Sequence, residues 1–172
     1  MDRPKAIAKR FLINRGDNLR FKELSYKILT GYSCFQVETR RKTPHYDVTA
    51  GIIWRNGRVL ITRRPKGTHL AGLWEFPGGK QEEGETLSAC LEREIKEELG
   101  MRVKAGRLLF SVGHEYDTKA ITLHVFQCTE LEGEPKAMEG QEARWVHPRE
   151  LPNLGFPPPD KTIIEFLLLS ST

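Results

Sequence analysis

The sequence predicts an α/β fold in which a mixed β-sheet is sandwiched between helices. Strand-like segments stand before, between and after two helical segments, and an Asn56-Gly57 pair joins two of them as a tight hairpin. The 172 residues suit one domain that buries roughly 70% of its unfolded surface. A content of 38% hydrophobic and 29% charged residues is ordinary for a globular protein.

The expected elements follow from periodicity and from turn residues. Strands are predicted at residues 48–54, 59–62, 74–76, 103–112, 121–129 and 143–146. A first helix is predicted from residue 86 to 99, ended by Gly100 in a left-handed C-cap. A second helix is predicted over residues 161–169, with Asp160 as its N-cap.

The N-terminal segment differs from the rest in charge. Residues 1–42 hold eleven Lys and Arg against four Asp and Glu, so the remaining 130 residues carry a net −3 of the total +4. Weak helical periodicity is expected at residues 5–13 and 21–29. We therefore predict a basic, loosely ordered extension over residues 1–43 and one domain over residues 44–172. Basic and aromatic residues do not alternate there, so no stable nucleic-acid complex is expected.

Composition also indicates the compartment. No apolar run is long enough to span a membrane, and no signal-peptide core is present near residue 1. Cys34, Cys90 and Cys128 are odd in number and widely spaced, which is typical of reduced thiols. A cytoplasmic protein without membrane partners, monomeric or homodimeric, is expected.

One arc of the first predicted helix is crowded with carboxylates. At 100° per residue, Glu97 and Glu98 lie within about 60° of Glu94, directly beside the apolar stripe. Ionised carboxylates this close together repel one another, and protonation or a bound cation would relieve the repulsion. Oxygen ligands without His or Cys suit Mg²⁺, or alternatively Mn²⁺, which also bind phosphates. The alternative is a solvated acidic face that Arg93 partly neutralises.

A glycine-rich loop precedes this helix. Phe76-Pro77-Gly78-Gly79 and Gly84 let the backbone approach a ligand where side chains would collide, and Glu85 adds a carboxylate at the helix start. A glycine-rich turn, a helix and an acidic cluster together indicate a metal–phosphate site. The loop is no P-loop, because Gln81 stands where Ser or Thr would be required.

Residues 79–101 match the Nudix box, G-x5-E-x7-R-E-U-x-E-E-x-G-U with U aliphatic, at every fixed position. These positions are Gly79, Glu85, Arg93, Glu94, Ile95, Glu97, Glu98, Gly100 and Met101. The segments ITRR, HLAGLWEFPGGK, ITLHVF, GEP, EGQ and FPPPD follow in the order found in MutT-like nucleoside triphosphate pyrophosphohydrolases. Residues 46–169 therefore resemble this family, which implies the Nudix fold.

The resemblance implies a hydrolase that uses Mg²⁺ or Mn²⁺ to convert nucleoside triphosphates into monophosphate and pyrophosphate. Oxidised or otherwise unwanted nucleotides such as 8-oxo-dGTP are the expected substrates. Their hydrolysis would give the protein a role in nucleotide-pool sanitisation and DNA repair. The implied metal ligands are Glu94, Glu97, Glu98, the Gly78 carbonyl and Glu139 in the loop MEGQ. Arg93 would orient the carboxylates, and Glu85 would brace the junction of loop and helix. Glu94 is expected first, and Glu139 second, as general base.

For the nucleoside, the resemblance implies contacts from Arg64, His69 and the backbone of Glu75, Phe76, Pro77 and Gly78, with Lys119 as a weaker candidate. Asp160 stands where the 8-oxoguanine-selective bacterial enzyme has Asn. An ionised Asp only accepts hydrogen bonds and so favours amino groups. A pyrophosphohydrolase of CTP, dCTP or 5-methyl-dCTP is therefore the alternative.

Two further classes are considered. An ADP-ribose hydrolase would place a Pro beyond the box, where Tyr116-Asp117-Thr118 stand. A non-catalytic Nudix recognition module, such as that of an adenine-removing DNA glycosylase, would lose box carboxylates, and all of Glu94, Glu97 and Glu98 are present. Both classes are less favoured than nucleotide hydrolysis.

Overall fold

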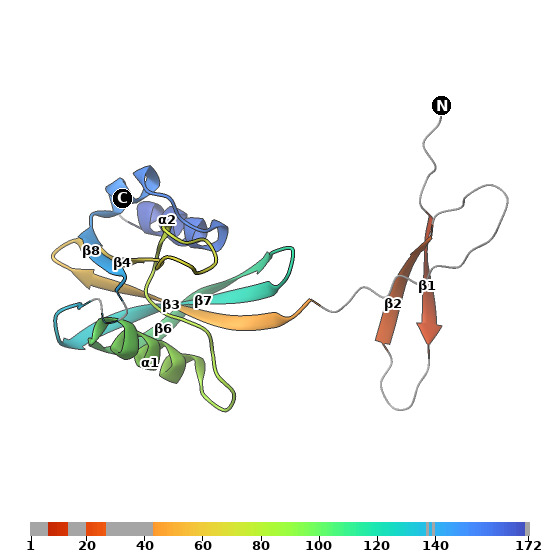
Figure 1. The fold of residues 1–172 in the computed structure, drawn as a ribbon, viewed down its shortest axis with the longest axis horizontal. Coiled ribbons are helices and arrows are strands. Elements are labelled where there is room, and N and C mark those ends of the chain that lie inside the picture. The colour runs from red at the N-terminus through yellow and green to blue at the C-terminus, as the bar shows by residue number, and fades with distance from the viewer. Residues whose placement is uncertain (1–6, 14–19, 27–42, 137, 139, 171–172) are drawn as a thin grey trace. The chain divides into compact units, whose positions relative to one another are not determined.

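The computed structural model describes residues 7–13, 20–26, 43–136, 138 and 140–170. The chain divides into two units, one up to residue 42 and one from residue 43. In the first, strands β1 (Ile7–Ile13) and β2 (Arg20–Tyr26) pair antiparallel (Figure 1). The helices that the weak periodicity of these two segments indicated are therefore wrong, and strands are found instead. Segments of this length are too short for stable isolated helices, and antiparallel pairing supplies their backbone hydrogen bonds instead.

The second unit contains the predicted alternation of strands and helices. Its elements are β3 (His45–Arg55), β4 (Arg58–Arg63), β5 (Trp74–Glu75), α1 (Leu87–Leu99), β6 (Arg102–Glu115), β7 (Ala120–Glu132), β8 (Glu142–Val146), the 3₁₀ helix η1 (Pro148–Asn153) and α2 (Pro158–Leu169). Strands β3 and β7 are parallel, β6 is antiparallel to β7, and β4 pairs antiparallel with β3, β5 and β8. The mixed sheet predicted from the sequence is confirmed.

The β3–β4 hairpin opens immediately after its turn. Asn56 and Gly57 have φ of 50° and 73°, as a two-residue turn of this kind requires. Pairing then continues only to Trp54 opposite Val59. Residues 77–81 take over the free edge of β3, where the amides of Gly51 and Thr49 donate to the carbonyls of Pro77 and Gly79 at 2.8 Å each. The glycine-rich loop is therefore held against the central strand.

The two helices pack on opposite faces of the sheet, as Figure 1 shows. Alternation along β3 directs Ile53 towards α1 and Ile52 towards α2. The α1 cluster contains Leu60, Leu91, Ile95, Leu99, Met101 and Phe126. The α2 cluster contains Ile61, Trp74, Phe76, Val125, Phe156, Ile163 and Leu167. The predicted sandwich is confirmed.

The sequence predicted the ends of α1 correctly but not the start of α2. Helix α1 begins after Thr86, whose hydroxyl accepts a hydrogen bond from the Ala89 amide at 3.2 Å, and ends at Gly100 with φ 63°. The predicted Asp160 cap of α2 is wrong. That helix begins at Pro158, because prolines pre-set φ in a first helical turn, and Asp160 lies inside this turn. Within the described residues, no helix combines the length and apolarity needed to cross a membrane.

Candidate active site

A cavity of about 610 Å³ brings the glycine-rich loop, helix α1 and the start of α2 together. At the α1 end it is lined by Gly78, Gly79, Glu94 and Glu98. At the other end it is lined by Arg64, His69, Glu75, Tyr116 and Asp160. Most of the residues that the sequence singled out therefore lie along one continuous space.

The glycine-rich loop passes β3 too closely for side chains. At Gly78, where φ is 148°, an added Cβ would collide with the Thr49 carbonyl oxygen. The Gly79 carbonyl accepts hydrogen bonds from both the amide (2.8 Å) and the hydroxyl (3.2 Å) of Thr49. The hydrogen bonds that join the loop to β3 use the carbonyls of Pro77 and Gly79 and not that of Gly78. Gly78 and Gly79 both line the cavity.

Helix α1 directs two of the three predicted carboxylates into this cavity. Glu94 and Glu98 line it, whereas the Glu97 side chain is 56% exposed and pairs with Arg93 at 3.0 Å. Burial raises the pKa of Glu94 above its ordinary value, although Arg93 counteracts this. Among the residues that the structure describes, no three His, Cys, Asp or Glu side chains gather closely enough to hold a metal ion.

Arg93 joins three carboxylates of the box. Its Nε and Nη2 donate to the two oxygens of Glu85 at 3.2 and 2.7 Å, and its Nη1 donates to Glu94 at 2.9 Å and to Glu97 at 3.0 Å. Arg93 and the Glu82 amide together lower the pKa of Glu85 to about 2. The guanidinium group therefore fixes the position of Glu94 relative to the loop.

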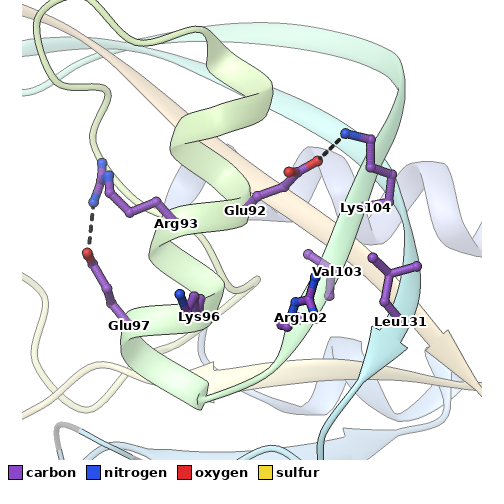
Figure 2. A pocket seen from close by; sticks show the side chains of 8 residues that line it. All are labelled: Glu92, Arg93, Lys96, Glu97, Arg102, Val103, Lys104 and Leu131. Atoms are coloured by element: carbon purple, nitrogen blue, oxygen red, sulfur yellow. Dashed lines mark hydrogen bonds and ion pairs between the residues drawn. The ribbon is translucent and has the colours of Figure 1, made fainter.

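The outer side of α1 carries a separate cavity of about 600 Å³ (Figure 2). Figure 2 shows Glu97 paired with Arg93 along the helix, and Glu92 reaching Lys104 on β6 at 3.1 Å. This cavity contains neither Glu94 nor Glu98, and no residue of the glycine-rich loop. Glu94, Glu98 and the glycine-rich loop therefore belong to the first cavity, whereas Glu97 lines this second one.

The end of the first cavity away from α1 is formed by an ion pair, two rings and a buried acid. Arg64 pairs with Glu75 and donates from Nε to the His69 carbonyl at 2.7 Å. The His69 ring meets Tyr116 edge-on at 5.0 Å. Burial raises the pKa of Glu75 despite its pairing with Arg64.

Asp160 is the most buried acid of this end, at 7% exposure. Its Oδ1 accepts a hydrogen bond from the Phe76 amide at 3.1 Å. Burial raises its pKa to about 7, the Phe76 hydrogen bond acting in the opposite direction. The sequence-based expectation of an acid that only accepts hydrogen bonds concerns the ionised form of Asp160. A pKa raised in this direction favours the protonated form, which can also donate.

Several lining residues were not singled out by the sequence. Tyr116 begins the turn between β6 and β7, with its amide donating to the Lys119 carbonyl at 2.7 Å. Lys80 stands 3.7 Å from the Tyr46 ring centre, and both line the cavity. The sequence did offer one signal for Tyr116, because it is an aromatic residue in the turn between two predicted strands. Nothing in the local sequence marks Thr62, which also lines the cavity.

Glu139 lies outside the described residues. The loop on either side of it contacts the end of α1, where the Glu98 carbonyl accepts hydrogen bonds from the Met138 amide at 2.9 Å and from Gln141 Nε2 at 3.3 Å. The role that the resemblance implies for Glu139 stays a prediction.

The fold and the site define a class of protein: an α/β domain whose glycine-rich loop and acidic helix border one cavity of about 610 Å³. A family model described as "NUDIX domain" matches residues 49–166, and the chain belongs to this family. This match, together with the 8-oxo-dGTP diphosphatases and MutT structures to which the chain is similar, confirms the MutT-like assignment made from the sequence.

Similar sequences and a similar solved structure support this membership. The chain is 41% identical over 123 residues to the 8-oxo-dGTP diphosphatase of Haemophilus influenzae, which covers 70% of this chain and 90% of the relative. It is 36% identical over 119 residues to the CTP pyrophosphohydrolase of Escherichia coli, which covers 69% of this chain and 88% of the relative. The solution structure of the E. coli ORF135 protein superposes with a TM-score of 0.66 at 35% identity, covering 74% of this chain and 92% of that one.

Proposed function

We propose that the protein hydrolyses nucleoside triphosphates to nucleoside monophosphate and pyrophosphate with the help of Mg²⁺ or Mn²⁺. The substrates favoured are oxidised or non-standard nucleotides such as 8-oxo-dGTP. The observation that supports this most is the single cavity that joins Glu94 and Glu98 to Arg64 and Asp160. A triphosphate at one end and a base at the other would fill such a space.

The donor atoms fit a hard divalent cation. Glu94, Glu98 and the Gly78 carbonyl offer only oxygen, and Mg²⁺ is commonly held by one or two carboxylates together with water and substrate phosphates. Glu97 would join them after releasing Arg93, and Glu139 is the further ligand that we propose. When bound, the cation supplies neutralisation of the polyphosphate and activation of water.

The remaining roles belong to side chains of the chain itself. Arg93 would hold Glu94 in place while Glu85 anchors Arg93. Glu94, or else Glu139, would accept the proton of the attacking water as the bond to the departing pyrophosphate breaks. The burial that raises the pKa of Glu94 makes its carboxylate a better proton acceptor.

At the nucleoside end, Arg64 and His69 would contact base and sugar, and the backbone of Glu75, Phe76, Pro77 and Gly78 would line the pocket. Asp160 would read the edge of the base. A partly protonated Asp160 can both donate and accept, as the Asn of the 8-oxoguanine-selective enzyme does, which supports an oxidised purine.

A cytidine nucleotide is the second candidate substrate. In its ionised form Asp160 accepts hydrogen bonds from an exocyclic amine such as that of cytosine. The similarity to a CTP pyrophosphohydrolase points the same way. CTP, dCTP and 5-methyl-dCTP therefore belong in the first substrate panel.

The experiment is a release assay. Purified protein with Mg²⁺ is incubated with 8-oxo-dGTP, dGTP, CTP, dCTP and 5-methyl-dCTP, and pyrophosphate and monophosphate are quantified. Release from at least one is expected, and release from none rejects the proposal. Glu98→Gln should lower turnover by orders of magnitude with the fold intact. Glu132→Gln, which alters an exposed ion pair with Arg102 outside the cavity, is the matched control.

We also propose that the protein acts in the cytoplasm, as a monomer or homodimer, without a stable nucleic-acid complex. Free Cys90 and Cys128, both buried, suit a reducing compartment. Sedimentation analysis of the purified protein tests the oligomeric state.

A further inference from the structure

Leu70 has a backbone conformation that is unusual for its residue type. Among the described residues, two non-glycine residues have a left-handed φ, Asn56 at 50° and Leu70 at 61°. Asn56 stands in the β3–β4 hairpin turn, and asparagine tolerates this conformation because its short polar side chain can bond locally. Leucine gains no such bond, and its Cβ makes the conformation unfavourable. The backbone conformation therefore does not explain the residue type at position 70.

The loop between β4 and β5 shows which residue its backbone would favour. Gly67 and Gly72, on either side of Leu70, have φ of 89° and 81°. A Cβ added at either glycine would meet nothing within 4 Å, so the left-handed conformation, and not a lack of space, accounts for glycine there. The same conformation would favour glycine at position 70. The leucine found there costs stability, which indicates that its side chain has a use.

Hydrogen bonds within the loop hold Leu70 in this conformation. The Leu73 amide donates to the Leu70 carbonyl at 3.3 Å, and the Arg64 amide donates to the Leu73 carbonyl at 2.9 Å. The Gly72 amide donates to the Arg64 carbonyl at 3.0 Å. The carbonyl of His69, the residue before Leu70, accepts from Arg64 Nε at 2.7 Å. The loop is thus closed on Arg64, and its bonds over-determine the place of Leu70.

The Leu70 side chain does not belong to the core of the described residues. It is half-buried, and it is neither a member of the two core clusters nor one of the hydrophobic side chains packed against them. Leu70 instead lines the cavity, as do its neighbour His69 and the loop residue Arg64. An apolar side chain cannot satisfy phosphate oxygens, but it can cover the face of a base or the carbon atoms of a sugar.

We propose that Leu70 is a substrate-binding residue whose side chain packs against the nucleoside of the bound nucleotide. This inference rests on the proposed hydrolysis of nucleoside triphosphates. Binding buries apolar surface that the free protein leaves half-exposed, and this burial offsets the unfavourable backbone conformation. Apolar packing is non-directional and reads no hydrogen-bonding groups, so Leu70 strengthens the binding of each nucleotide that the site accepts.

The test separates the side chain of Leu70 from its backbone. Leu70→Ala removes most of the side chain and keeps the Cβ, Leu70→Gly also removes the Cβ, and Leu70→Met keeps an apolar side chain of similar volume. Asn56→Gly is the matched control, because it changes the other left-handed residue, which lies outside the cavity. We measure the melting temperature without ligand, KM and kcat for the best triphosphate, and the Kd of its monophosphate and of pyrophosphate with Mg²⁺ by calorimetry.

We expect Leu70→Ala and Leu70→Gly to raise KM and the Kd of the monophosphate roughly tenfold, with kcat and pyrophosphate binding unchanged. Leu70→Gly should melt higher than Leu70→Ala, because alanine retains the unfavourable Cβ. Leu70→Met should bind the monophosphate as the wild type does, and Asn56→Gly should change no binding constant.

Two results would overturn the role of Leu70 in an active wild type. One is normal KM and monophosphate binding in Leu70→Ala, and the other is an equal weakening of pyrophosphate and monophosphate. A Leu70→Gly protein that melts below Leu70→Ala contradicts the strain at this position. If the wild type hydrolyses no triphosphate and binds no monophosphate, the proposed function itself fails, and the inference about Leu70 fails with it.

Discussion

The Glu94 carboxylate lies directly against the Cα of Gly79. A Cβ added at Gly79 would stand 2.5 Å from Oε2 and 2.6 Å from Oε1 of Glu94, closer than non-bonded atoms approach. Gly79 itself is fixed by the hydrogen bonds of its carbonyl to Thr49. The first and fourth fixed positions of the box are therefore in contact, and the glycine at the first makes room for the acid at the fourth.

Gly79→Ala should displace Glu94 and leave the fold intact. The loop cannot retreat because it is bonded to β3, so the side chain of Glu94 must rotate away from its place beside Arg93. We expect kcat to fall by two orders of magnitude or more, on the scale at which misplacement of a catalytic group acts. Steady-state kinetics and a thermal melt measure both effects. Gly113→Ala is the control, since a Cβ there meets nothing closer than 4.0 Å. Equal activity of both variants would refute the contact argument.

Arg93→Lys should uncouple the carboxylates that Arg93 joins. One ammonium group cannot replace the bidentate bonds to Glu85 together with the bond to Glu94. We expect kcat to fall roughly a hundredfold, because Glu94 loses its fixed partner. Arg102→Lys, at an exposed ion pair with Glu132, should keep full activity.

The same Arg93 variant should change the acid side of the stability curve. The pKa of Glu85 is lowered from 4.5 to about 2, so its ion pair adds stability above pH 4.5 and loses it as the pH falls towards 2. The difference in unfolding free energy between wild type and Arg93→Lys should shrink across this window in urea titrations. A difference that is constant with pH would contradict the pairing of Glu85 and Arg93 in solution.

The core of the fold could be predicted because its signals are local. Asn56-Gly57 and Gly100 fix a turn and a helix end through their own backbone preferences, and the structure has both in the predicted place. The N-terminal strands were missed since short, weakly periodic segments adopt whichever structure their pairing allows. The α2 start was missed because Asp160 resembles a cap, while its partner, Phe76, is distant in sequence.

The sequence predicted only the part of the site that lies on helix α1 and on the glycine-rich loop before it. Residues 78–98 lie close together in sequence, and the family pattern names them together. Tyr116 and Thr62 reach the cavity only through the pairing of strands, which no local pattern encodes. Helical geometry placed Glu97 beside Glu94, yet its side chain pairs with Arg93 outside the cavity. The direction of a long side chain depends on its ionic partners as well as on its position on the helix.

Removal of residues 1–42 should leave catalysis unchanged. Among the described residues, those that line the cavity run from 46 to 160, and contacts divide the chain between residues 42 and 43. The truncated protein should keep kcat/KM within about twofold and a cooperative melt, because both core clusters of the described residues lie within residues 48–168. An inactive but folded truncation would show that the basic segment takes part in substrate binding.

Asp160→Asn should stabilise the protein at neutral and alkaline pH. Burial raises the pKa of Asp160 from 3.8 to about 7, so between these values the native state holds a proton that the unfolded chain has released. The unfolding free energy of the wild type therefore falls as the pH rises from 4 to 7 on account of this group. The variant does not ionise, and its amide oxygen can still accept the hydrogen bond of the Phe76 amide.

Urea titrations from pH 4 to pH 8 measure this difference. The two proteins should be nearly equal at pH 4, and the variant should gain up to ~3 kcal/mol by pH 8. Asp47→Asn, at a half-exposed carboxylate that pairs with His124 outside the cavity, controls for the loss of an acid as such. If the advantage of Asp160→Asn were the same at pH 4 and pH 8, Asp160 would have to be ionised throughout, and its ability to donate to a base would be lost with it.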